Sequence, residues 1–195
     1  YHDGRHLAEP HTAWNSVPHV HWSKSAFWYQ IWYILIIKYV FPKKWLFLNP
    51  KVKIIKLYYM KNIENAIQLF ENGYVCSQAV FATFSQDLGL SEEQALNIGA
   101  CFGSGMRKGE VCGACTGALM ALGLKYGESK SKSNEVCEKF LDEFEKENGS
   151  YICRDLLNCD IRTEEGIKYA LDNNLFKEFC PKMVESATKI TENYL

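Results

Sequence analysis

Histidine is missing from residues 60–195 of this 195-residue chain. All five histidines and all five tryptophans precede Met60, whereas all eight cysteines follow it. Without histidine, and without a Cys-x-x-Cys-His motif, these residues have neither the attachment site nor the axial ligand of a c-type haem, so no haem is expected. A soft metal centre in this part of the chain would have to use thiolates as ligands.

Strand-type alternation of apolar and polar residues is also missing there, as are internal repeats and low-complexity tracts. Glycine is concentrated between Gly103 and Gly109, where three glycines occur in seven residues. Their spacing fits neither G-x-G-x-x-G nor the P-loop pattern, and no predicted strand precedes them, so no nucleotide is expected. We expect a flexible loop that shields a cysteine site.

Positive charge is scarce in the second part of the chain. Residues 1–59 hold 8 Lys and Arg against 2 Asp and Glu, while residues 60–195 hold 14 against 21. An acidic segment offers no electrostatic attraction for nucleic acid or for an anionic membrane surface. We therefore expect neither as a partner.

These changes in composition coincide at Met60, the first methionine of the chain. We interpret residues 1–59 as a non-domain N-terminal extension of upstream or misannotated sequence, and residues 60–195 as a cysteine-rich module. An interfacial or membrane-spanning anchor and a real folded extension are the alternatives for residues 1–59.

The anchor alternative is based on the apolar run at residues 26–37. These twelve residues would cover about 18 Å as a helix, against a hydrocarbon core of about 30 Å, and charged residues from Lys38 onwards interrupt any extension. The mostly polar residues before the run also fit a secretory signal poorly. Metal binding by His19 and His21 is not expected in such a segment.

Apolar residues of the cysteine-rich module recur with helical spacing almost throughout. The pattern predicts an all-α fold, a compact bundle of about six to seven short helices. Residues 111–126, small or apolar on nearly every side, are expected to form its central Gly/Ala-rich helix. The other predicted helices are one ended by Gly73, one from about Cys76 ended by Gly89, one from Ser91 towards Cys101, one over 133–148, a turn over 154–157, one over 163–173 and one around 183–190.

The cysteines of the module indicate a reducing, cytoplasmic setting, because no secretory signal accompanies them and disulfide scaffolds are rare in the cytosol. A free cysteine often only fills a core. Four of the eight, however, lie within about one turn of a predicted helix start: Cys76, Cys112, Cys153 and Cys180. Free N–H groups and the helix dipole stabilise thiolate there, and thiolate is the form that binds metal or attacks disulfides.

Four cysteine motifs follow one another along the module: Gly73-Tyr-Val-Cys76-Ser-Gln-Ala-Val80, Gly109-Glu-Val-Cys112-Gly-Ala-Cys-Thr-Gly117-Ala-Leu, Cys153-Arg-Asp-Leu-Leu157 and Cys180. Their ordered combination resembles the redox-active protein family with the C, GCAxxG, C, C cysteine pattern, over about residues 60–195. In this chain the second motif reads CGAxxG.

This resemblance implies redox activity without defining a reaction. It makes Cys76, Cys112, Cys153 and Cys180 the four motif cysteines, with Gly113, Ala114 and Gly117 as the small-residue signature. We expect the four cysteines to be the metal ligands and all seven residues to contact a cofactor. The module is also similar to a domain found beside haem in certain anaerobe cytochromes, which points to iron–sulfur chemistry. Cys101, Cys115, Cys137 and Cys159 lie outside the family pattern.

An iron–sulfur cluster held by the four motif cysteines for electron transfer is the leading hypothesis. Their spacings of 36, 41 and 27 residues match no standard ferredoxin run, so four different helices would have to supply the ligands. A zinc site with the same four cysteines as ligands is an alternative that meets the same difficulty, because structural zinc normally uses at least one closely spaced cysteine pair.

Thiol–disulfide exchange is the hypothesis that would make the protein an enzyme. Cys112 and Cys115 form a Cys-x-x-Cys at a predicted helix start, where the first thiol attacks and the second resolves the mixed disulfide. No βαβ unit surrounds this pair, however. A helical interaction domain whose cysteines only pack is a further alternative. In every redox hypothesis an unidentified redox partner protein is expected, and a homodimer that shares a site is left open.

Overall fold

Helices make up most of residues 50–195, the part of the chain that this computed structural model describes, with side chains described from Met60 onwards. The apolar run at residues 26–37 and the pair His19 and His21 lie outside the described residues. In chain order the α-helices are α3 (Pro50–Glu71), α4 (Cys76–Ser85), α5 (Glu92–Gly99), α6 (Gly113–Tyr126), α7 (Lys130–Asn148), α8 (Cys153–Leu157), α9 (Glu164–Asp172), α10 (Leu175–Glu178) and α11 (Cys180–Glu192).

The predicted all-α class is confirmed. Seven of these helices have seven or more residues, and residues 50–195 contain no strand, only one isolated antiparallel bridge between Val111 and Ile152. None of the helices within this range has the length and apolar character needed to cross a bilayer.

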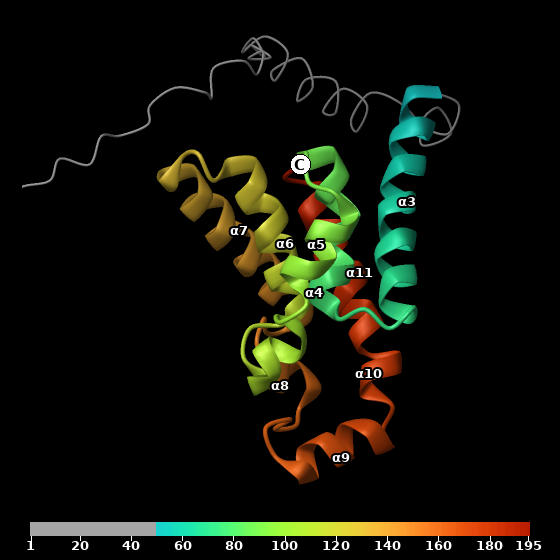
Figure 1. Cartoon of the computed structure of the whole chain (residues 1–195), viewed down its shortest axis with the longest axis vertical. Coiled ribbons are helices and arrows are strands. Elements are labelled where there is room, and N and C mark those ends of the chain that lie inside the picture. Colours follow the sequence, from blue (N-terminus) through green and yellow to red (C-terminus); the bar gives the residue numbers. More distant parts are fainter. Residues whose placement is uncertain (1–49) are drawn as a thin grey trace, which may run out of the picture. The chain divides into compact units, whose positions relative to one another are not determined.

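The centre of the bundle is the contact between α4 and α6 (Figure 1). Helices α3, α5 and α11 pack against α4, while α7 and α11 pack against α6. The side chains of Ala114, Cys115 and Ala118 on α6 are fully buried. The central Gly/Ala-rich helix is therefore where the sequence predicts it, and α4 shares the central position.

Glycine allows α4 and α6 to approach closely. A Cβ atom on Gly117 would lie 2.5 Å from the carbonyl oxygen of Ser77, a distance that no side chain tolerates without a shift of the backbone. Buried hydroxyls in the same layer are satisfied, since Ser77 donates to the carbonyl oxygen of Gly99 over 2.7 Å. Small residues thus place the start of α4 directly against the start of α6.

Most helix ends follow the predicted signals. Gly73 and Gly89 have positive φ angles of 95° and 82° after α3 and after the turn that ends α4. The capping box at Ser91 forms, with the Gln94 N–H donating to the Ser91 hydroxyl over 3.2 Å.

Three elements differ from the prediction. Helix α7 begins at Lys130 instead of residue 133, because the Ser129 hydroxyl accepts the Lys132 N–H and caps the helix earlier. The four-residue helix α10 carries no apolar period of its own and was not predicted. Helix α3 spans Met60, so this position is not a helix boundary. Whether the module is independent of residues 1–59 stays a prediction.

Candidate functional site

The four motif cysteines all lie at helix starts, as predicted. Cys76, Cys153 and Cys180 are the first residues of α4, α8 and α11, and Cys112 is the residue that precedes α6. Glycine turns or Pro181 fix these starts, since proline at the first turn of a helix costs no hydrogen bond. The free N–H groups of two longer helices, α4 and α6, are therefore next to Cys76 and Cys112.

These four cysteines line one cavity of about 720 Å³, which we call the cysteine cavity. Much of the remaining wall is apolar, with Phe70, Ile161, Phe176 and Met183 among its residues. Cys112 and Cys153 are buried, while Cys76 and Cys180 are half-buried. Cys76 and Cys180, which are 104 positions apart in the sequence, thus line the same cavity.

Backbone hydrogen bonds bring two of the cysteines together. The Cys112 N–H donates to the carbonyl oxygen of Tyr151 over 2.8 Å, and the Cys153 N–H donates to that of Glu110 over 2.6 Å. These two bonds flank the antiparallel bridge of Val111 with Ile152. The bridge therefore fixes the start of α8 beside the start of α6.

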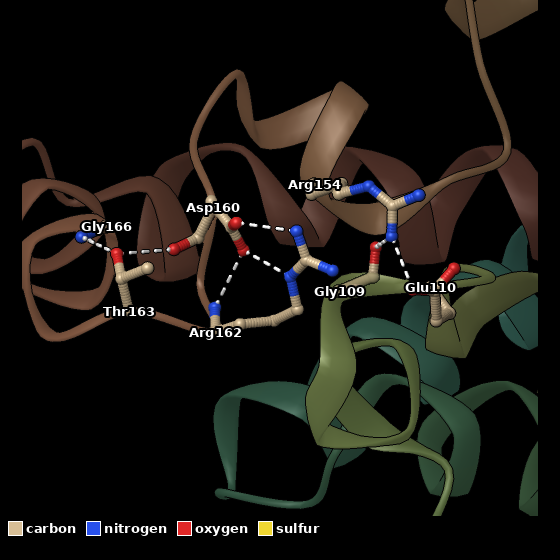
Figure 2. A network of polar contacts seen from close by, with 7 residues as sticks. All are labelled: Gly109, Glu110, Arg154, Asp160, Arg162, Thr163 and Gly166. Atoms are coloured by element: carbon tan, nitrogen blue, oxygen red, sulfur yellow. Dashed lines mark hydrogen bonds and ion pairs between the residues drawn. The ribbon is translucent and has the colours of Figure 1, made fainter.

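An ion pair joins the two segments next to this bridge (Figure 2). The Arg154 guanidinium donates to the Glu110 carboxylate over 2.5 Å and to the carbonyl oxygen of Gly109 over 3.5 Å. Both charged side chains are partly exposed, at 32% and 42%, so the ion pair adds only a modest stabilisation. Its geometric effect is to join the end of the glycine segment to α8.

A second polar cluster begins α9 (Figure 2). The Asp160 carboxylate accepts from the Arg162 side chain over 2.8 and 2.7 Å and from its backbone N–H over 3.0 Å. Thr163 donates from its hydroxyl to the Asp160 carbonyl oxygen and accepts from the N–H of Gly166. A Cβ on Gly166 would come within 1.9 Å of that carbonyl oxygen, so only glycine fits this turn.

The glycine segment is an ordered left-handed turn instead of an irregular loop. Ser104, Gly105, Met106 and Arg107 follow one another with φ angles of 53°, 57°, 55° and 59°. Left-handed conformations cost about 1–2 kcal/mol for each residue that carries a Cβ, and such strain often lies at functional sites. Ser104 and Arg107 both line the cysteine cavity, so this segment lies beside the motif cysteines. That it is flexible and shields them stays a prediction.

The turn also stabilises the Cys76 sulfur. The backbone N–H of Ser104 donates to this sulfur, and the Arg107 guanidinium adds favourable charge. Burial outweighs these contributions and, together with repulsion from Cys112, raises the pKa of the Cys76 thiol to about 12. Cys153 and Cys180 behave alike, because burial, and then the neighbouring thiolates, raise the pKa of both thiols.

Cys112 is the exception among the motif cysteines. Its sulfur accepts a hydrogen bond from the Cys115 thiol and further hydrogen bonds from the N–H groups of Ala114 and Cys115 at the start of α6. These bonds lower the pKa of Cys112 in spite of burial. Cys115 is fully buried, and its pKa is raised by that burial and by the bond it donates. The pair therefore consists of one acidic thiol and one that holds its proton.

The small residues of the second motif have different positions. A Cβ on Gly113 would lie 3.3 Å from the Cys76 sulfur, so Gly113 permits the approach of that cysteine. Gly117 faces the backbone of α4, and Ala114 is buried in the core. The described contacts of Gly117 are thus with the neighbouring helix and not with the cavity.

The four cysteines outside the motif are not among the residues that line the cavity, although Cys115 and Cys159 contact cysteines that do. Cys101 is exposed and Cys137 is half-buried on α7. Cys159 packs in a small apolar cluster with Cys153 and Cys180, and its charge is felt by both. The sequence did not single out Cys159, Arg107 or Lys177, because no local pattern links them to the motif.

No set of three or more His, Cys, Asp and Glu side chains within residues 60–195 is arranged to hold a single metal ion. Four thiolates around one zinc ion would lie about 3.8 Å apart, given Zn–S bonds of about 2.3 Å. The zinc alternative and the cluster both stay predictions.

Comparison with known proteins agrees with the cysteine pattern. No curated protein and no solved structure gives a significant match to this chain. A family model described as "Putative redox-active protein (C_GCAxxG_C_C)" matches residues 74–194, which is more than half of the chain and includes all four motif cysteines. The chain belongs to this family of redox-active cysteine proteins.

Proposed function

We propose that Cys76, Cys112, Cys153 and Cys180 hold an iron–sulfur cluster in the cysteine cavity and that the protein transfers electrons to a partner protein in the cytoplasm. The observation that carries this proposal is the shared cavity: four thiols from four separate helix starts line one space. Thiol–disulfide exchange uses two thiols, and core packing requires no cavity. A cluster with four thiolate ligands uses all four.

The chemistry of the wall fits such a group. All donors are thiols, the ligands that iron–sulfur clusters use, and the module offers no histidine in competition. N–H groups of Ser104, Ala114 and Cys115 donate to the Cys76 and Cys112 sulfurs. Hydrogen bonds of this kind stabilise thiolate ligands and raise the potential of a cluster. When bound, the cluster would supply one-electron transfer.

The residues of the chain would then have separate roles. The Val111–Ile152 bridge holds Cys112 and Cys153 in place, and the left-handed turn brings a donor and a positive charge to Cys76. Apolar residues such as Ile161 and Met183 limit the access of water to the sulfurs. Four thiols that repel one another as anions are stabilised together only by a cationic centre, which the cluster iron provides.

A panel of Cys→Ser variants, purified without oxygen, tests this proposal. Replacing Cys76, Cys112, Cys153 or Cys180 removes a ligand, so each variant should lose most of its visible absorption, iron and sulfide. The matched controls are Cys101→Ser and Cys137→Ser, which do not line the cavity and should retain the wild-type content of iron and sulfide. Equal effects of motif and control variants would contradict a site built from the four motif cysteines.

Thiol–disulfide exchange by Cys112 and Cys115 is the second candidate, favoured by the hydrogen bond between them and the lowered pKa of Cys112. The Cys112 thiolate would attack a disulfide of a partner protein, form a mixed disulfide and release one partner thiolate, which takes up a proton. Cys115 would then lose its proton and attack the Cys112 sulfur, forming the Cys112–Cys115 disulfide and releasing the second partner thiol. The partner gains two electrons, and the pair is oxidised.

The variant Cys115→Ser separates the two candidates. In the cluster proposal Cys115 is a neighbour of a ligand, so the variant keeps most of its iron. In the exchange proposal the resolving thiol is gone, so the variant accumulates a mixed disulfide through Cys112 that mass spectrometry detects after alkylation. Cys112→Ser serves as the control, because it cannot form that adduct.

A further inference from the structure

Two positive side chains at the mouth of the cysteine cavity lack an ion-pair partner within the described part of the chain. Arg107 and Lys177 both line the cavity and are exposed. The ion pairs formed by residues 60–195 involve other side chains. Glu71 is the one charged residue of opposite sign on the cavity wall, and it pairs with neither. The formal charge of the wall, counting thiols as neutral, is therefore +1.

Polarity changes from the mouth of this cavity to its interior. Arg107 and Lys177 lie in the exposed part of the wall, whereas Ile161 and Met183 are 6% and 7% exposed. Phe70 and Phe176, both half-buried, add aromatic surface to the wall. A volume of about 720 Å³ lies within the range of about 300–1,000 Å³ that small-molecule sites occupy. The four cysteines account for only part of this wall.

The left-handed turn gives Arg107 its position at a cost in backbone strain. Three residues with side chains, Ser104, Met106 and Arg107, adopt positive φ within four positions, and two of them line the cavity. The Ser104 N–H is used by the Cys76 sulfur, but nothing among the described residues uses the Arg107 charge as an ion pair. Residues held in such strained conformations cluster at active sites and ligand-binding sites.

We propose that the cysteine cavity also binds a small organic anion, with an aromatic or apolar body between Phe70 and Phe176 and a carboxylate or sulfonate at Arg107 and Lys177. The inference goes beyond the proposed function, because it needs only the shape and charge of the cavity and not a cluster. It gives the protein a second ligand class besides metal: an amphipathic molecule held next to the redox-active sulfurs.

Two dyes of similar shape test the proposal on the full chain, purified without oxygen. One is 1-anilinonaphthalene-8-sulfonate, which has an anionic group, and the other is N-phenyl-1-naphthylamine, which has none. Dye fluorescence gives the dissociation constant of each. Both should bind the apolar wall, and the anionic dye should bind more tightly.

Charge variants identify the contact. Replacing Arg107 or Lys177 by Gln should raise the dissociation constant of the anionic dye about twofold to fivefold, as expected for a partly exposed ion pair. The dissociation constant of the neutral dye should stay the same. The double variant should bring the two dissociation constants close together. The matched controls are Lys108→Gln and Lys182→Gln. These exposed lysines are near Arg107 and Lys177 in the sequence but do not line the cavity, so neither substitution should change the dissociation constant of either dye.

The outcomes are separable from those of the cluster proposal, because iron and sulfide are measured in the same samples. Iron-free protein that still distinguishes the two dyes through Arg107 and Lys177 supports the anion site and contradicts the cluster. The anion site alone is overturned if the protein contains iron but the dissociation constant of the anionic dye is unchanged by both substitutions. It is also overturned if Lys108→Gln changes that constant equally. Equal weakening of the binding of both dyes in the double variant also overturns the anion site, because the two residues would then act through the folding of the protein.

Discussion

Cys112 and Cys153, 41 residues apart in the sequence, are diagonal neighbours across the antiparallel bridge of Val111 with Ile152. The N–H of each donates across the bridge, Cys112 to Tyr151 and Cys153 to Glu110. In an antiparallel pair, diagonal residues of this kind lie on the same face, about 7–8 Å apart. Two backbone hydrogen bonds therefore explain why the second and third motif cysteines share one cavity.

The ion pair of Arg154 with Glu110 should support this bridge. Arg154→Met and Glu110→Gln are each expected to lower the free energy of unfolding by about 0.2–1 kcal/mol, because both side chains are partly exposed. A double-mutant cycle from chemical denaturation measures their coupling, which should shrink as salt is added. A coupling energy of zero at low salt would mean that the pair does not brace the bridge.

Replacement of Gly117 should destabilise the bundle at its centre. In Gly117→Ala the new methyl group meets the Ser77 carbonyl oxygen at 2.5 Å, so α4 and α6 must separate, at a cost of about 1–3 kcal/mol. Gly123→Ala is the matched control in the same helix, since its Cβ meets nothing within 4 Å. This variant should gain about 0.5–1 kcal/mol from helix propensity. Thermal unfolding measures the change in stability of each variant. If both substitutions stabilised or both destabilised the protein, the close approach of α4 to α6 would be contradicted.

Asp160 should remain ionised in unusually acidic solution. Hydrogen bonds from the Arg162 side chain and backbone lower its pKa from the ordinary value of 3.8 to about 2. Because the folded-state pKa is the lower one, the stability that this carboxylate contributes is fully present above pH 3.8 and is lost as the pH falls towards 2. A carbon-13 NMR titration of the carboxyl group measures the midpoint. Arg162→Gln should move it back towards 3.8, whereas a wild-type midpoint near 3.8 would exclude the bidentate contact.

The fragment 60–195 should fold without the residues that precede it. It removes the first ten residues of the 22-residue helix α3 but retains Ile63, Ala66 and Leu69, which pack in the core. We expect helical circular dichroism and a cooperative melt. The fragment 50–195, which keeps all of α3, is the control and should melt at a higher temperature. If only the longer fragment melts cooperatively, the boundary at Met60 is wrong.

Local signals were sufficient to predict every helix except α10 and to place each motif cysteine at a helix start. Gly73 before Cys76 and Pro181 after Cys180 act within a few residues, and the Gly/Ala content of α6 is a direct sign of close packing. Such features depend on backbone preferences that a short segment carries by itself.

Tertiary features could not be predicted in this way. The Val111–Ile152 bridge joins two segments that show no strand alternation, because a single bridging pair needs no period. The left-handed turn is closed by the Glu110 N–H, which donates to the Gly105 carbonyl oxygen, a contact that the three glycines of residues 103–109 do not reveal. Arg107 and Lys177 reach the cavity through that turn and through α10, neither of which has a sequence signature.

Iron and acid-labile sulfide in the anaerobically purified wild-type chain test the central claim most directly. The account predicts a coloured protein with equal amounts of both, about two or about four of each per chain, and without stoichiometric zinc. A colourless, iron-free protein whose eight cysteines all titrate as free thiols would contradict it.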